Sequence, residues 1–273
     1  MSKPSPSPDY GQITDRQRAT WTRGDFNEIA RQNVGMAEAL VEAADPHPDQ
    51  RVLDVACGSG TLALVAARRY CQVTGLDYVP SLITRATARA EVTGYDVDFR
   101  VGDAQALPFP DDSFDVVLSV YGVQFAPDQV QAATELLRVC KPGGTIGLAG
   151  PIPEGWSGDW FAAHGTYMPS PPNVDSPLRW GTADGLETLL GSGVESIESE
   201  ERSARQYYRS VDHAVDVFST YFGPTVTALE TLDDADGAAL LEDLRAIMQR
   251  YNRATDGTAI VENRYLQTLA VTT

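Results

Sequence analysis

The chain has 273 residues, of which 42% are hydrophobic, and it carries a formal net charge of −17 at pH 7. Nucleic acids and anionic membranes are bound by clustered Lys and Arg, and the absence of such a cluster argues against both as partners. No apolar run approaches the 18 residues that a membrane span needs. The odd number of cysteines, three, predicts a reduced, cytoplasmic setting rather than a disulfide framework.

The first half of the chain predicts an alternation of helices and strands. Residues 1–24 are expected to form a tail, disordered over Met1 to Tyr10, and then a partly helical arm. One helix is predicted from Asp25 to Ala44, because apolar side chains recur there at helical spacing. Strands are then predicted at 51–55, 73–77, 98–101, 115–120 and 145–149, and helices at 61–70, 80–92 and 128–140. Alternating strands and helices indicate a parallel sheet with a core domain at 25–150.

The composition changes after this core. Residues 151–181 hold six prolines and three of the four tryptophans, which predicts an ordered cap rather than a disordered linker. We expect this cap to cover the carboxyl ends of the strands, where open α/β sheets bind ligands. Residues 182–273 are predicted to complete the sheet, with strands at 196–208 and 261–271 and helices at 182–190, 212–221 and 235–253.

A glycine-rich turn follows the first predicted strand. Gly58 and Gly60 allow the backbone to approach a ligand closely, and the following helix directs free N–H groups towards it. Asp77 ends the next strand, where its carboxylate is placed to accept hydrogen bonds from two ribose hydroxyls. The same glycine spacing also fits a nicotinamide dinucleotide site, so this turn alone leaves two cofactors open.

Three further features separate these cofactors. Asp54 ends the first strand, where a carboxylate would repel a pyrophosphate but would hold a ligand with an amine and a sulfonium. Asp103 follows the third strand and can accept a bond from an adenine amino group. The stretch from Leu137 to Gly144 ends a helix with a Pro-Gly-Gly turn before the apolar run at 145–149.

Together these residues resemble the class I S-adenosylmethionine-dependent methyltransferases, over about residues 50–150. Within that family they look most like the ubiquinone/menaquinone C-methyltransferases and related small-molecule enzymes. The resemblance implies an α/β, Rossmann-like fold: a seven-stranded, mostly parallel sheet with helices on both faces, its last strand antiparallel between the fifth and sixth. We expect the cap to be inserted after the fifth strand. Ala56 departs from the family, which often has glycine there, and its methyl group fits if its φ is negative.

The resemblance also assigns residues to S-adenosylmethionine. The backbone of the glycine turn would hold the methionine part, and acidic and apolar side chains would hold the ammonium, ribose and adenine. Ser119 would meet the amino-acid moiety. The residues expected to bind the cofactor are Asp54, Ala56, Gly58, Gly60, Asp77, Tyr78, Leu82, Asp103, Ala104 and Ser119.

The acceptor side is predicted from position alone. Two catalytic candidates are His164 in the cap, as a general base, and Tyr121 after the fourth strand. Trp21 is a candidate to close over the cofactor, where an aromatic face would favour the sulfonium. The residues expected to bind the acceptor are Gln124, Phe125, Trp160 and Tyr167. The histidines are too far apart in sequence to suggest a metal site.

The sequence therefore predicts a cytoplasmic methyltransferase that acts on an oxygen, nitrogen or carbon atom of a small organic molecule by in-line displacement. Two alternatives remain: an enzyme of the same fold that uses the cofactor as a scaffold, such as a cyclase, and a nicotinamide-dependent oxidoreductase. The sequence does not identify the acceptor or the oligomeric state.

Overall fold

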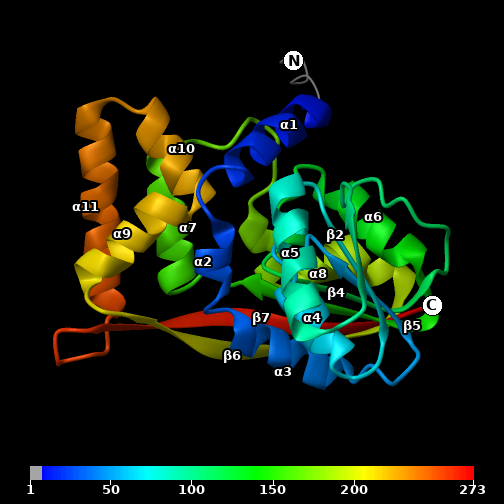
Figure 1. The fold of residues 1–273 in the computed structure, drawn as a ribbon. Helices are drawn as coiled ribbons and strands as arrows, with labels where there is room; N and C mark the ends of the chain where they lie inside the picture. Colours follow the sequence, from blue (N-terminus) through cyan, green and yellow to red (C-terminus); the bar gives the residue numbers. More distant parts are fainter. Residues whose placement is uncertain (1–7) are drawn as a thin grey trace, which may run out of the picture.

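A computed structural model describes residues 8–273, so residues 1–7 of the predicted tail lie outside the described residues (Figure 1). Seven strands form one sheet in the order β3-β2-β1-β4-β5-β7-β6. The strands are β1 (Arg51–Val55), β2 (Gln72–Asp77), β3 (Val97–Val101), β4 (Phe114–Val120), β5 (Cys140–Pro151), β6 (Val194–Tyr208) and β7 (Ala259–Thr272). This order confirms the predicted fold class.

The carboxyl ends of the parallel strands lie along one edge of the sheet. β1 pairs in parallel with both β2 and β4, whereas β7 runs antiparallel between β5 and β6, as the resemblance implied. Because β1, β2 and β4 run the same way, Val55, Asp77 and Val120 end their strands at this common edge. The sequence order of the strands reverses beside β1, and ligands bind at such a switch point in open α/β sheets.

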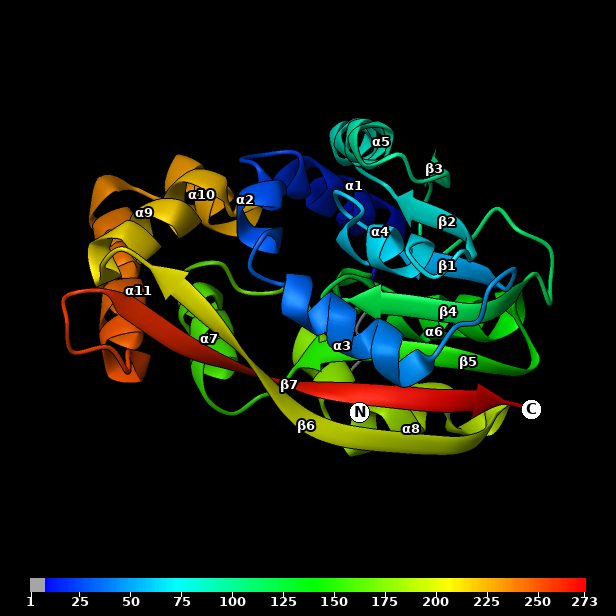
Figure 2. The same ribbon diagram turned by 60° about the horizontal axis from the view of Figure 1, so that its bottom comes forward.

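Helices cover both faces of the sheet (Figure 2). The α-helices of the described chain are α1 (Tyr10–Trp21), α2 (Phe26–Ala30), α3 (Val34–Ala44), α4 (Thr61–Ala67), α5 (Pro80–Thr93), α6 (Gln129–Val139), α7 (Trp156–Tyr167), α8 (Ala183–Leu190), α9 (Val211–Tyr221), α10 (Gly223–Thr231) and α11 (Asp234–Tyr251). Apolar residues of α3 and α4 form one core with the sheet, and those of α6 and α8 form another. The sheet is therefore buried on both sides, as its apolar central strands require.

A third core lies beyond the end of the parallel strands. β6 and β7 extend past the other strands, and α7, α9, α10 and α11 stand over this extension (Figure 1). We call these four helices the helical cap. The segment 151–181 contributes α7 to it, whereas its second helical turn, Pro177–Gly181, buries Trp180 in a core of the sheet. The cap thus combines residues from 151–181 with residues from 182–273.

Three local predictions were wrong. The predicted helix from Asp25 to Ala44 is two helices, α2 and α3, separated at 31–33, where the side-chain oxygen of Gln32 accepts the backbone N–H of Tyr207 in β6. α4 ends at Ala67, and the chain turns at Tyr70, which has a φ of 62°. The sequence analysis missed α10, whose start at Gly223-Pro224 has the composition of a turn.

No helix among residues 8–273 is long and apolar enough to cross a membrane.

Candidate active site

The glycine-rich turn between β1 and α4 has the conformation that its glycines permit. Gly58 and Gly60 have φ angles of 54° and 79°, in the left-handed region. A Cβ atom on Gly60 would lie 2.6 Å from the Phe99 ring, so only glycine fits there. Ala56 also has a positive φ, 55°, so the condition under which its methyl group fits without strain, a negative φ, is not met. The turn therefore holds one strained non-glycine residue where the family often has glycine.

An arginine that the sequence analysis did not single out fixes this turn. Arg89, on α5, donates hydrogen bonds from Nη1 to the carbonyl oxygen and to Oγ of Ser59, at 2.6 and 3.0 Å. The same nitrogen lies 3.1 Å from Oγ1 of Thr61. Burial lowers the pKa of this guanidinium, and a like charge at Arg85 adds to that effect. α5 thus restrains the outer side of the glycine turn.

Asp77 lies at the centre of the site. Its two carboxylate oxygens each accept one backbone N–H, from Gly58 and from Val79, at 2.9 Å. The residue is only 5% exposed, and this burial raises its pKa to about 6. Each carboxylate oxygen has a second lone pair, which can accept a ligand hydroxyl without breaking these bonds.

Asp54 is a second buried acid beside the turn. Its Oδ2 accepts the Ala63 N–H at 2.9 Å, and burial, with the nearby charge of Asp77, holds its pKa well above the usual range. No ion pair to Asp54 occurs within residues 8–273. Asp54 lines a cavity of about 400 Å³ together with Gly58 and Asn33. A cationic group in this cavity would stabilise the ionised carboxylate.

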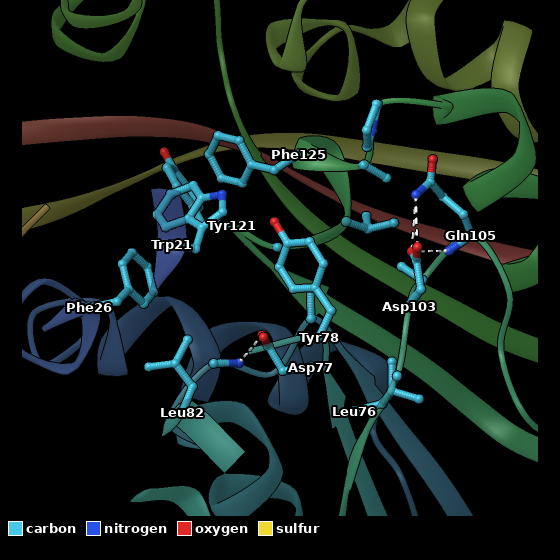
Figure 3. Close-up of a pocket in the computed structure, with 18 residues that line it drawn as sticks. Trp21, Phe26, Leu76, Asp77, Tyr78, Leu82, Asp103, Gln105, Tyr121 and Phe125 are labelled. Atoms are coloured by element: carbon cyan, nitrogen blue, oxygen red, sulfur yellow. Dashed lines mark hydrogen bonds between the residues drawn. The ribbon is translucent and has the colours of Figure 1, made fainter. Parts of the chain in front are cut away.

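A larger cavity of about 610 Å³ opens beside Asp77 (Figure 3). At its far wall Gln105 donates to Asp103 from its backbone N–H, at 2.9 Å, and from Nε2, at 3.1 Å. Nε2 of Gln105 also donates to Thr14 of α1, which ties the N-terminal helix to this wall. Of the predicted cofactor residues, those that line this cavity are Ala56, Gly58, Asp77, Tyr78, Leu82, Asp103 and Ala104.

A second cavity, of about 500 Å³, lies between the turn region and the helical cap. Four aromatic residues line both cavities: Trp21, Phe26, Tyr121 and Phe125. The Trp21 ring packs edge-on at 5.4 Å from Phe26 and 4.9 Å from Phe125, measured between ring centroids. We call these four residues the aromatic junction. These residues form the part of the wall that the two cavities share.

A hydrogen bond links Tyr121 of the aromatic junction to β7, on the wall of the second cavity. Its φ is 49°, a strained value for this residue, and its hydroxyl donates to Oδ1 of Asn263 on β7 at 3.0 Å. Burial raises the pKa of this hydroxyl, so it keeps its proton near neutral pH. Tyr121 is thus placed as a hydrogen-bond donor rather than as a base.

Other predicted site residues lie outside the two larger cavities. Ser119 donates from Oγ to the Val55 carbonyl at 2.8 Å and accepts the Val123 N–H at 3.0 Å, which ties β1 to β4. Gln124 is buried and lines neither cavity. Gly60, at the start of α4, and Asp54 also lie outside both, although Asp54 lines the 400 Å³ cavity.

Three residues of α7 were predicted to take part in catalysis or acceptor binding. Trp160 lines the second cavity, whereas His164 and Tyr167 line neither cavity. His164 contacts the Trp160 carbonyl through Nδ1, at 2.9 Å, and Oγ1 of Thr225 through Nε2, at 2.8 Å. Burial lowers its pKa, and both ring nitrogens are engaged within the cap. Tyr167 donates to Asp243 of α11. Because neither residue lines a cavity of the site, we do not assign them a role in the chemistry.

Several residues of the second cavity escaped the sequence analysis. Asn33, Ser157, Gln206 and Asn263 line it, and they come from four separate segments. One signal was present: Asn263 occupies an inward position of β7, between the buried Val261 and Tyr265. A polar residue on the buried face of a strand requires a partner, either in the protein or in a ligand.

Comparisons with known proteins identify the family of this chain. A family model described as a methyltransferase domain matches residues 53–148. An uncharacterized protein of Mycobacterium tuberculosis is 36% identical over 270 residues, which cover 97% of each chain. A demethylmenaquinone methyltransferase of Deinococcus radiodurans is 38% identical over 173 residues, covering 63% of this chain and 71% of that protein. A Haemonchus contortus phosphoethanolamine N-methyltransferase, solved with S-adenosylhomocysteine, shares the fold with a TM-score of 0.59 at 20% identity, over 100% of this chain and 62% of that chain.

The chain therefore belongs to the class I S-adenosylmethionine-dependent methyltransferases that act on small molecules. Its cofactor is S-adenosylmethionine, and S-adenosylhomocysteine is the product of that cofactor. The scaffold-type and nicotinamide-dependent alternatives are not favoured by this membership.

Proposed function

We propose that S-adenosylmethionine binds across the carboxyl ends of β1, β2 and β4, with its methyl group at the aromatic junction. The observation that carries this placement is the pair of buried acids beside the glycine turn. Asp77 keeps lone pairs for two ribose hydroxyls, and Asp54 faces a cavity in which an ammonium group would offset its burial. The residues present thus fit both ends of the cofactor.

The remaining contacts follow from this placement. Adenine would lie in the 610 Å³ cavity between Tyr78 and Leu82, with its amino group at Asp103 and its ring nitrogen near the backbone N–H of Ala104. The sulfonium would then lie against Trp21 and its neighbours in the junction. An aromatic face near a cation contributes about 0.5–2 kcal/mol.

When bound, the cofactor supplies a methyl group on a sulfonium, which a nucleophile takes by in-line displacement as the C–S electron pair returns to sulfur. The protein's part is alignment, because the aromatic junction narrows the path between the two cavities. The same rings exclude water from the reacting atoms. Tyr121 holds its proton and donates to Asn263, which keeps the floor of the second cavity in one arrangement.

The second cavity is where we place the acceptor. It adjoins the junction, and it is walled by α7 and α9 of the helical cap, with Trp160 and Phe125 among its lining residues. We propose that the cap, which includes residues 151–181, determines which acceptor reaches the methyl group. The nucleophilic atom would be an oxygen, nitrogen or carbon.

We also propose that the enzyme is cytoplasmic and does not act on nucleic acid. The net charge of −17 disfavours phosphate backbones, and the three free, buried cysteines suit a reducing compartment.

Calorimetric titration tests the cofactor placement. S-adenosylhomocysteine should bind with micromolar affinity, and NAD and NADP, run alongside, should not bind. Incubation with S-adenosylmethionine and a library of small acceptors should then give products heavier by one CH₂ group. Binding of the nicotinamide cofactors in place of the thioether would contradict the proposal.

A further inference from the structure

No charged side chain from residues 8–273 lines the second cavity, where we place the acceptor. Charged residues make up 22% of the whole chain, yet none of the residues that line this cavity is Asp, Glu, Lys, Arg or His. Its wall consists mainly of rings from Trp21, Trp156, Trp160, Phe161, Phe218 and Phe222. In so acidic a protein, this neutrality restricts what the cavity can hold, because a buried ion without a partner is costly.

The polar residues that line this cavity carry amides and hydroxyls. Oδ1 of Asn263 accepts two hydroxyl donors, Tyr121 at 3.0 Å and Ser157 at 2.8 Å. Two donors on one oxygen fix the orientation of the carboxamide and leave its Nδ2 as the remaining donor. Within residues 8–273 no hydrogen bond uses that Nδ2, although Asn263 is only 1% exposed.

Two tryptophans of the same wall contribute apolar ring surface. The indole nitrogens of Trp156 and Trp160 are buried, and neither has a hydrogen-bond partner in the part of the chain that the structure describes. The rings of these residues lie 5.2 Å apart, measured between centroids, on consecutive turns of α7. Because both nitrogens are enclosed by protein, a ligand in the cavity would meet the faces of these rings, and Nδ2 of Asn263 remains as a donor that no residue of the described chain uses.

We propose that the acceptor is an uncharged, ring-containing molecule, and that Asn263 binds its hydroxyl or carbonyl oxygen through Nδ2. This inference rests on the proposed function, because it assumes that the second cavity holds the acceptor. The carboxamide is placed by Tyr121, which also lines the cofactor cavity. Asn263 is a specificity-determining residue: its neutral amide binds an uncharged oxygen and offers no counter-ion to a charged acceptor.

Three naphthalene derivatives of similar size test the charge selectivity. 2-Naphthol is neutral, 2-naphthoate is an anion and 2-naphthylmethylammonium is a cation at pH 7. Each is titrated into the full-length enzyme saturated with S-adenosylhomocysteine, and binding is followed by calorimetry. We expect 2-naphthol to bind at least about tenfold more tightly than either ion, because only the ions must lose hydration without a charged partner. Equal or tighter binding of an ion would overturn the inference.

Asn263→Leu tests the residue itself. The substitution keeps the size of the side chain and removes the donor, so 2-naphthol should bind at least about threefold more weakly, in line with the loss of one hydrogen bond. Gln267→Leu is the matched control, because Gln267 is a buried carboxamide on the same strand that lines neither cavity. It should leave 2-naphthol binding unchanged. The proposed role of Asn263 is wrong if both variants bind 2-naphthol like the unmodified enzyme.

The affinity for S-adenosylhomocysteine separates the possible failures. It should be the same in the unmodified enzyme and in Asn263→Leu, which also shows that the variant is folded. If the unmodified enzyme does not bind the thioether, the proposed function fails. If it binds the thioether but does not prefer 2-naphthol, only this inference fails. Should Asn263→Leu not fold, Ser157→Ala removes one of the two hydroxyls that orient the carboxamide, and it should weaken 2-naphthol binding in the same direction.

Discussion

Asp77→Asn should weaken the binding of S-adenosylhomocysteine by a factor that depends on pH. The carboxylate of Asp77 is buried and has a pKa of about 6, raised by desolvation. At pH 7.5 it is ionised and can accept charge-assisted bonds from the ribose hydroxyls, each of which contributes about 1.5–3 kcal/mol. Since about 1.4 kcal/mol corresponds to a tenfold change in affinity, the variant should bind at least about tenfold more weakly at this pH.

At pH 5 the same comparison should give a much smaller factor. A carboxyl with a raised pKa is protonated below that pKa, so only about one tenth of the Asp77 side chains would be ionised at pH 5. The unmodified enzyme should therefore lose about tenfold in affinity between pH 7.5 and pH 5, and it should approach the variant to within about threefold. Asp54 is also buried with a raised pKa, and the charge of Asp77 contributes to that rise. Asp77→Asn therefore lowers the pKa of Asp54 and keeps it ionised to lower pH, which narrows the difference between the two proteins at pH 5 further.

Calorimetric titrations of both proteins at the two pH values measure this ratio. Asp98→Asn on the neighbouring strand β3 is the control, because Asp98 is exposed, pairs with Arg100 and lies away from the cavities. It should bind the thioether like the unmodified enzyme at both pH values. A ratio for Asp77→Asn that is the same at pH 5 and pH 7.5 would show that its ionisation does not control ribose binding.

Three further changes have defined outcomes. Ala56→Gly should raise the melting temperature by about 2–4 °C in scanning calorimetry, because glycine adopts the observed φ of 55° without strain; a lower melting temperature would refute this. Arg89→Met should lower the melting temperature and weaken thioether binding at least about threefold, since the glycine turn loses three contacts; unchanged binding would show that the turn is rigid by itself. His164→Gln should retain the rate of methyl transfer to an acceptor found by screening within about threefold, and a hundredfold loss would restore His164 as a candidate base.

The sequence was sufficient for the sheet and for most of the cofactor side because both depend on local patterns. A strand, a glycine turn and a helix follow one another within residues 51–67, and Asp77 ends the next strand. Such patterns keep their geometry wherever they occur. The positive φ of Ala56 could not be foreseen, because the surrounding loop imposes this dihedral angle and the residue type does not reveal it.

The acceptor side could not be derived in the same way because its wall is assembled from distant segments. These residues, Asn33, Ser157, Gln206 and Asn263, meet only after α7 has packed on the long antiparallel pair of β6 and β7. Helical periodicity indicated which residues are apolar, but not which neighbours they would face. His164 illustrates the limit: its place in the cap was foreseen, whereas its contacts with Trp160 and Thr225 depend on helix packing.

The most direct measurement is a crystal structure of the enzyme with S-adenosylhomocysteine. The account predicts adenine beside Asp103, the ribose hydroxyls on Asp77, and the sulfur atom at the aromatic junction, facing the cavity that contains Asn263. A sulfur atom directed away from that cavity, or a ribose that does not contact Asp77, would contradict the account.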